Sequence, residues 1–78
     1  MFQDILIKLT GKREIYIENY KNILDYREDR ILIQGKKESV LLRGTDFKIE
    51  YFSSECMRIK GYLTSLEYGD GNKTADRW

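Results

Sequence analysis

Few side chains in this sequence could carry out catalysis or hold a metal ion. The chain has no histidine and a single cysteine, Cys56, so the commonest general base and the usual zinc ligands are missing. Carboxylate pairs exist, such as Glu14 with Glu18 and Glu50 with Glu67, but no pattern places either pair in a cleft. The glycines match neither a dinucleotide-binding motif nor a phosphate-binding loop. The sequence therefore predicts a protein that is not an enzyme, with no catalytic residue, no metal ligand and no cofactor.

Tyrosines interspersed with cations are the other chemical feature of the sequence. Aromatic rings beside positive charges on a sheet face can stack on the bases of single-stranded nucleic acid. Tyrosine also favours half-exposed strand faces for packing alone, and the 14 Lys and Arg are balanced by 13 Asp and Glu. Because a net charge of +1 provides no positive field, we expect no affinity for oligonucleotides at physiological salt. The residues concerned are Tyr16, Tyr20, Tyr51, Tyr62, Tyr68, Lys12, Arg13, Lys21, Lys48, Arg58 and Lys60.

A polar segment, residues 18–22, interrupts two apolar alternations and could be either a binding site or a turn. Asn19 and Asn22 suit the left-handed and side-chain-capped conformations of tight connections. In a turn here, Glu18 and Tyr20 would project from the sheet face opposite the two isoleucines that precede them. That face could bind a partner, or it could simply be the outside of the sheet. The composition favours a plain turn, because turn residues explain it without a ligand.

Period-2 alternation of β-branched and aromatic residues predicts strands along most of the chain, and no window carries the stripe of an amphipathic helix. A length of 78 residues suits one small domain. We therefore predict an all-β fold, a single small domain built as an antiparallel meander of about seven short strands that forms a sandwich or a partly open barrel. The predicted strands lie within residues 4–11, 13–20, 22–26, 30–34, 39–43, 47–52 and 56–68.

The alternation also predicts which side chains form the core. The domain is expected to span residues 1–68, whereas residues 69–78 lack apolar periodicity and are expected to form a flexible C-terminal tail. The predicted inner face consists of Ile7, Leu9, Ile15, Ile17, Ile31, Ile33, Val40, Leu42, Phe47, Ile49, Ile59 and Leu63.

Two glycines close matching apolar runs, Gly44 after "VLLR" and Gly61 after "MRIK". Thr-Asp follows Gly44, which favours a turn, whereas more strand follows Gly61, which favours a bulge or a bend. A valine at either position is expected to cost roughly 1–3 kcal/mol, the range for strained backbone positions. A valine in place of Gly71, in the predicted tail, should cost very little.

The sequence also indicates where the protein works. No apolar run approaches the roughly 20 residues that span a bilayer, and Asp4 interrupts the N-terminal apolar residues, so no secretory signal is expected. A lone cysteine excludes an internal disulfide and fits a reducing compartment. These features predict a cytoplasmic protein that does not insert into a membrane.

Four segments follow one another in order and at the right spacing: "REIYIENYKNILDY", "RILIQ", "VLLRGTDFKIEYFS" and "MRIKGYLTSLEY". Together they resemble the YabP/YqfC family of sporulation proteins, and the chain looks YqfC-like. The family pattern is I-x-I-E-N-[YH]-K, an extended I-x-I segment, I-x-G-x-x-[LF]-x-I, and finally I-x-G-x-[IL]-x-x-[IL]-x-[YF]. The resemblance covers roughly residues 5–68, although this chain lacks the proline and the longer N-terminal lead-in that family members often have. The matching residues are Ile15, Ile17, Glu18, Asn19, Tyr20, Lys21, Leu42, Gly44, Phe47, Ile49, Ile59, Gly61, Leu63, Leu66 and Tyr68.

The resemblance implies a non-enzymatic protein of an endospore-forming bacterium with a structural or adaptor role in spore development. It implies action through contacts with another protein, for which a membrane protein of the sporulation apparatus is a candidate, and it leaves a homo-oligomer open. The implied location is the cytoplasm of a sporulating cell, mother cell or forespore, or the periphery of a membrane through that partner. The alternative is a small β-barrel that binds single-stranded nucleic acid. The candidate partner surface or family signature comprises Glu18, Asn19, Tyr20, Lys21, Gly44 and Gly61.

Overall fold

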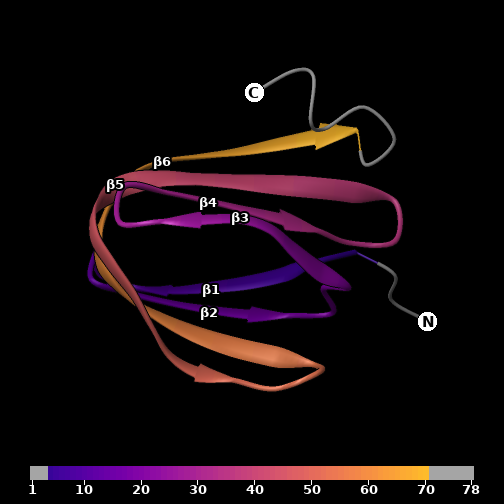
Figure 1. The fold of residues 1–78 in the computed structure, drawn as a ribbon, viewed down its shortest axis with the longest axis horizontal. Coiled ribbons are helices and arrows are strands. Elements are labelled where there is room, and N and C mark those ends of the chain that lie inside the picture. Colours follow the sequence, from indigo (N-terminus) through magenta and orange to yellow (C-terminus); the bar gives the residue numbers. More distant parts are fainter. Residues whose placement is uncertain (1–3, 71–78) are drawn as a thin grey trace.

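A computed structural model describes residues 4–70 and places six antiparallel strands in one sheet, in the order β1-β2-β6-β5-β4-β3 (Figure 1). The all-β prediction is confirmed, and the described part contains no helix, so none that could span a membrane. The strands are β1 (Leu6–Thr10), β2 (Glu14–Glu18), β3 (Asn22–Arg27), β4 (Arg30–Gln34), β5 (Glu38–Phe52) and β6 (Cys56–Asp70).

Two strands, β5 and β6, are 15 residues long and belong to both halves of the molecule. The first part of β6 pairs with β2, and the first part of β5 pairs with β4. One layer therefore contains β1, β2, the start of β6 and the end of β5, while the other contains β3, β4, the start of β5 and the end of β6. Figure 1 shows both long strands curving from one layer to the other. The prediction of seven short strands is corrected to six, because residues 39–43 and 47–52 are the two halves of β5.

The bend in the long strands contains both glycines that the sequence singled out. Gly44 lies inside β5 at a shift in register with β6, so the prediction of a turn there is wrong. A second shift between Thr45 and Lys48, with Asp46 at φ 57°, lets the strand turn the corner without ending. The predicted bend at Gly61 is confirmed, since its φ of 146° is a conformation that other residues rarely adopt.

The turns of the two short hairpins fasten this bend. The backbone N–H of Gly44 donates to the carbonyl oxygen of Asp29 at 3.0 Å, and that of Phe47 donates to Glu28 at 2.8 Å. On the other side, the N–H of Gly61 donates to the carbonyl oxygen of Arg13 at 3.1 Å. At the bulges these backbone N–H groups do not pair with the neighbouring strand. They donate instead to carbonyl oxygens of the β1–β2 and β3–β4 turns.

The core lies between the two layers and follows the predicted inner face closely. Leu9 was predicted to be inside, but half of its surface is exposed, because β1 is the last strand at its edge of the sheet. Ile7, Ile49 and Leu63 are only partly buried. The prediction did not include Ile5, Tyr20 or Met57, which are buried. The core cluster is Ile5, Ile15, Ile17, Tyr20, Ile31, Ile33, Val40, Leu42, Phe47, Met57 and Ile59.

The last strand is longer than the domain boundary drawn from the sequence. Gly69 pairs with Ser39 and Asp70 pairs with Glu38, so these two residues continue β6 rather than begin a tail. The remainder of the predicted tail, with Gly71, lies outside the described residues.

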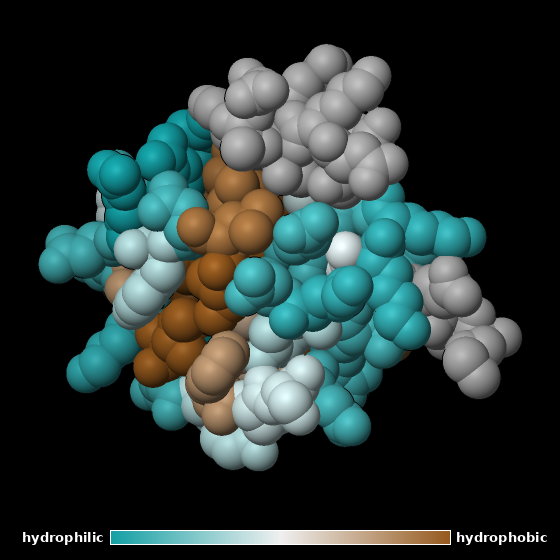
Figure 2. All heavy atoms as spheres, turned by 45° about the vertical axis from the view of Figure 1, so that its right-hand side comes forward, coloured by the Kyte–Doolittle hydropathy of each residue, from teal (hydrophilic) through white to brown (hydrophobic). Residues whose placement is uncertain are grey.

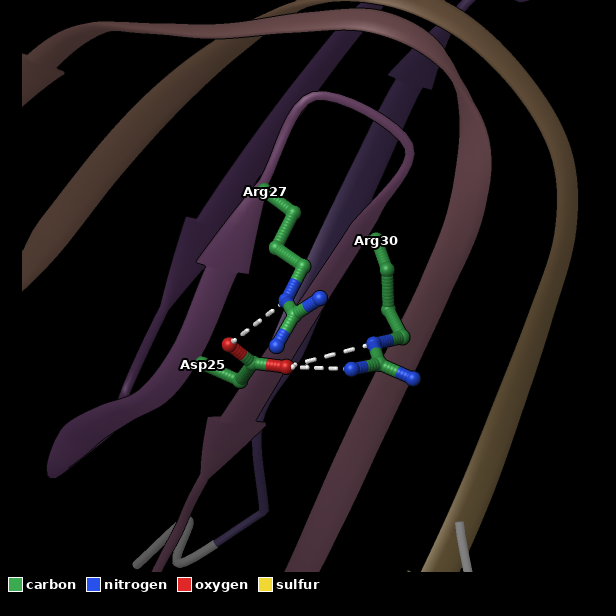
Figure 3. A network of polar contacts seen from close by, with 3 residues as sticks. All are labelled: Asp25, Arg27 and Arg30. Atoms are coloured by element: carbon green, nitrogen blue, oxygen red, sulfur yellow. Dashed lines mark hydrogen bonds and ion pairs between the residues drawn. The ribbon is translucent and has the colours of Figure 1, made fainter.

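The β3–β4 hairpin carries a network of charged side chains (Figure 3). One carboxylate oxygen of Asp25 accepts two hydrogen bonds from Arg30, at 2.8 and 3.2 Å, and the other lies 3.5 Å from Nε of Arg27. Burial alone would raise the pKa of Asp25, but the hydrogen bond from Arg30 and the charges of both arginines outweigh it and lower the pKa below its ordinary 3.8. The network is exposed enough that its effect on stability is small.

We expect the Asp25 carboxyl to titrate below pH 3.8, and an Arg30→Gln variant to move the midpoint upward. Because the folded-state pKa is lowered, the carboxylate stabilises the fold above the unfolded pKa, and that stabilisation disappears as pH falls through the folded value. Carboxyl chemical shifts followed by NMR from pH 2 to 6 measure the midpoint in both proteins. Equal midpoints in the two proteins would contradict the assigned cause.

Candidate functional site

Within the polar segment that the sequence singled out, residues 18–22, residues 18–21 form a corner at which the chain crosses from one layer to the other. It joins β2, which pairs with β1 and β6, to β3, which pairs with β4. Asn19 has a φ of 68°, the left-handed conformation expected for a turn asparagine. Its backbone N–H donates to Glu55 at 3.1 Å and its side-chain amide donates to the carbonyl oxygen of Asp4 at 3.1 Å. The backbone N–H of Lys21 donates to Gln34 at 2.7 Å. The segment is therefore a crossing between layers and not a hairpin.

Tyr20 does not project outward, as the turn interpretation predicted, but is buried with 7% of its surface exposed. Its hydroxyl donates to the carbonyl oxygen of Ser53, and its ring lies 6.2 Å from that of Phe52. Burial raises the pKa of the hydroxyl, and the nearby Cys56 adds to this effect. The left-handed residue before it reverses the direction of the chain, so the strand alternation that predicted an outward tyrosine no longer applies. Tyr20 ties the corner to the β5–β6 turn.

A Tyr20→Phe variant is expected to lower the free energy of unfolding by about 1 kcal/mol, since it leaves the Ser53 carbonyl without its partner while keeping the ring contacts. Tyr51→Phe is the matched control, because Tyr51 is 55% exposed and its hydroxyl makes no hydrogen bond with a described residue. Urea denaturation compares the two variants with the parent protein. A change no larger than that of the control would show that the buried hydroxyl does not stabilise the corner.

The corner borders an open hollow of about 420 Å³. Acidic and basic side chains stand around it, with Glu18 and Glu55 among the acids and Lys21 and Lys36 among the bases. Such a mixed rim suits a protein surface better than a uniformly charged ligand. No group of residues within 4–70 has the composition and proximity of a metal site. The lining consists of Leu6, Glu18, Asn19, Tyr20, Lys21, Lys36, Ser54, Glu55 and Cys56.

Glu18 links this hollow to the outer face of its layer. The hydroxyl of Tyr16 donates to Oε2 of Glu18 at 3.1 Å. Hydrogen bonding with Cys56, and then with Glu18, raises the pKa of Tyr16 to about 12. The phenol thus stays protonated over the physiological range and holds the carboxylate in place as a hydrogen-bond donor.

The structure separates the six candidate residues into two groups. Glu18, Asn19, Tyr20 and Lys21 line the hollow together, whereas Gly44 and Gly61 lie at the bend of β5 and β6. A side chain on Gly44 would meet the backbone of Tyr62, and one on Gly61 would meet the backbone of Asp46 and Phe47. The two glycines therefore shape the fold.

A further surface feature was not predicted from the sequence. On the outer face of the layer that contains β1 and β2, cross-strand pairing aligns Lys8, Tyr16, Arg58 and Tyr51 in one row over four strands. Lys8, Tyr16 and Arg58 also line a shallow hollow of about 440 Å³. Period-2 alternation places each of these residues on an outer face, but only the strand order, which the sequence does not reveal, brings them together.

A family model described as "YabP family" matches residues 3–75 of the chain. Among curated proteins and solved structures, no significant match was found. The matched region contains every described strand and all residues around the corner hollow.

Proposed function

Because this chain belongs to the YabP family, we propose that it is a non-enzymatic protein of spore development that acts by binding another protein. Family membership is consistent with a sporulation-related role. The expected partner is a protein of the sporulation apparatus, with a membrane protein as the first candidate. The expected location is the cytoplasm of the sporulating cell, including the membrane periphery where such a partner would hold it.

The observation that carries this proposal is the corner hollow. Four consecutive residues, from Glu18 to Lys21, which resemble the I-x-I-E-N-[YH]-K pattern, line one concave surface with a rim of both charges. Asn19 and Tyr20 are held by hydrogen bonds to other segments, so the surface is organised before any partner arrives. Lys21 is exposed and forms no ion pair with a described residue, so its ammonium group is available to a partner carboxylate.

Exposed apolar side chains also support the proposal that the chain binds another protein. Leu6, at the hollow, is 38% exposed, and Phe52, which packs on Tyr20, is 59% exposed. Figure 2 shows a strip of apolar side chains crossing a largely hydrophilic face. Contiguous exposed apolar surface of this kind is typical of protein–protein contact.

A Lys21→Glu replacement in an endospore-forming host tests the proposal. We expect it to reduce the yield of heat-resistant spores while the protein accumulates to its normal level, because a reversed charge at the rim repels the partner. Lys48→Glu is the matched control, since Lys48 is exposed on β5 and does not line the hollow. Spore counts and immunoblots measure both effects. A Lys21→Glu strain that sporulates as well as the control would contradict a role for the hollow.

The row of Lys8, Tyr16, Arg58 and Tyr51 favours a second candidate, binding of single-stranded nucleic acid. Glu14 and Glu18 on the same face offset its positive charge, and for this reason we rank it below protein binding. A fluorescent oligonucleotide titrated at two salt concentrations distinguishes the two. Micromolar binding that weakens steeply with salt would favour this second candidate.

A further inference from the structure

β1 is the end strand of the sheet within residues 4–70, so one of its edges has no neighbouring strand from that part of the chain. In an antiparallel pair, alternate residues direct their backbone N–H and C=O groups away from the partner strand. Those groups of β1 form no hydrogen bond with the described part of the chain. Leu6 and Leu9 on this strand are 38% and 50% exposed, so no described segment fully covers their side chains. β1 can therefore accept another strand.

The other end strand, β3, is protected against such pairing. Its register with β4 shifts between Ile23 and Asp25, which makes the strand irregular. Asp25 also holds the guanidinium groups of Arg27 and Arg30 on this hairpin (Figure 3). Bulges and charges are the usual means by which edge strands avoid pairing. β1 keeps a regular register with β2 over all five of its residues and contains no proline.

Lys8 determines which strand would fit at the open edge. It is the central residue of β1, is exposed, and forms no ion pair with any residue in 4–70. Its cross-strand neighbour is Tyr16, so it lies on the outer face, whereas Ile7 and Leu9 pair with the buried Ile17 and Ile15 and lie on the inner face. An added strand would place one residue beside Lys8 on the outer face and its two neighbours beside Ile7 and Leu9.

We propose that β1 binds an extended segment of a partner protein by strand addition, and that this segment carries a carboxylate flanked by apolar residues. The carboxylate would pair with Lys8, and the apolar side chains would cover Ile7 and Leu9. A second copy of this chain fits less well. Self-pairing centred on Lys8 would oppose two ammonium groups, and no register within Leu6–Thr10 offers them a carboxylate, because β1 has no acidic residue. The lysine thus selects an acidic segment and disfavours dimerisation.

Synthetic peptides test the proposal on the purified full-length chain, independently of any role in sporulation. One fluorescent peptide alternates valine with glutamate, and a matched peptide alternates valine with lysine. Fluorescence anisotropy measures their affinities for the parent protein, for Lys8→Glu and for Lys48→Glu, and hydrogen exchange locates the bound peptide. Lys48→Glu is the control, because it changes the net charge by the same amount. Lys48 lies on the same outer face, but on β5, at the edge of the layer farthest from β1. Thermal denaturation verifies that each variant is folded.

We expect the parent protein to prefer the glutamate peptide and to gain amide protection in β1. Lys8→Glu should weaken binding of the glutamate peptide by roughly three- to ten-fold and should strengthen binding of the lysine peptide. Lys48→Glu should change neither affinity. The proposal is overturned if the glutamate peptide does not bind, if both variants weaken its binding equally, or if the amides that gain protection lie outside β1. A dimer of the chain alone that protects the β1 amides would overturn it in favour of a second copy.

Discussion

Replacing Gly44 by alanine should destabilise the fold by about 3 kcal/mol or more, the upper part of the range for overpacked positions. An added Cβ would overlap the carbonyl oxygen of Tyr62 and would lie 2.8 Å from Cζ of the buried Phe47. A backbone oxygen cannot move aside as a flexible side chain can, so β5 and β6 would have to separate at the bend. A domain of this size has roughly 4–12 kcal/mol of stability in total, so a large part of it would be lost.

Gly11→Ala is the control for this experiment. Gly11 has a positive φ, 62°, which Gly44 lacks, but a Cβ at Gly11 would meet no atom within 4 Å. Its replacement should cost about 1 kcal/mol, the penalty of the left-handed conformation alone. Urea denaturation of both variants gives the comparison. If Gly11→Ala were as costly as Gly44→Ala, the close approach of the strands at Gly44 could not be the cause.

Replacing Gly61 by alanine should cost about 2–3 kcal/mol, for two combined reasons. A φ of 146° is strained for any residue with a Cβ, and that Cβ would lie 2.8 Å from the carbonyl oxygen of Asp46 and 2.8 Å from Cδ1 of Phe47. Thermal and urea denaturation measure the loss. Lys60→Ala serves as the neighbouring control, because Lys60 is exposed and its ion pair with Glu50, at 3.4 Å, is a surface pair of little energetic weight. A stable Gly61→Ala protein would mean that the bend tolerates other backbone conformations.

The positions of the strands and most of the core could be predicted from the sequence because both depend on local alternation. Ile15 and Ile17 alternate with half-buried Glu14, Tyr16 and Glu18 and are fully buried. Ile31 and Ile33 are also fully buried, on either side of the buried Leu32. The continuity of β5 could not be predicted in this way. Gly-Thr-Asp after an apolar run is typical of a turn, and only the pairing of β5 with β6 on both sides of the bulge keeps residues 38–52 in one strand.

Burial of Tyr20 and exposure of Leu9 were mispredicted for a related reason. The inward direction of Tyr20 follows from the left-handed backbone of Asn19 and from the carbonyl group of Ser53, which is distant in sequence. Leu9 follows the alternation correctly, but no described strand lies beyond β1 to cover it. Side-chain direction is a local property, whereas burial depends on which segments become neighbours.

Four residues of the corner hollow could be predicted as a group, but the hollow that they line could not. Glu18 to Lys21 were singled out together, and the structure places them around one hollow. Its other side is formed by Lys36 and by the β5–β6 turn, with Ser54, Glu55 and Cys56. Nothing in the local pattern connects these segments, because the β5–β6 turn meets Glu18 only when β6 pairs with β2, and Lys36 comes from the β4–β5 connection of the other layer.

The sharing of β5 and β6 between the layers has a consequence for the order in which a growing chain can fold. The β1–β2 and β3–β4 hairpins leave the ribosome first, but β2 finds its second neighbour only in β6, and β4 finds its second neighbour in β5. Until these later strands are synthesised, both early hairpins remain two-stranded, and such hairpins are at best marginally stable in water. The β3–β4 hairpin therefore gains a third strand as soon as β5 is available, whereas the β1–β2 hairpin gains its third strand only when β6, the last described strand, has been synthesised.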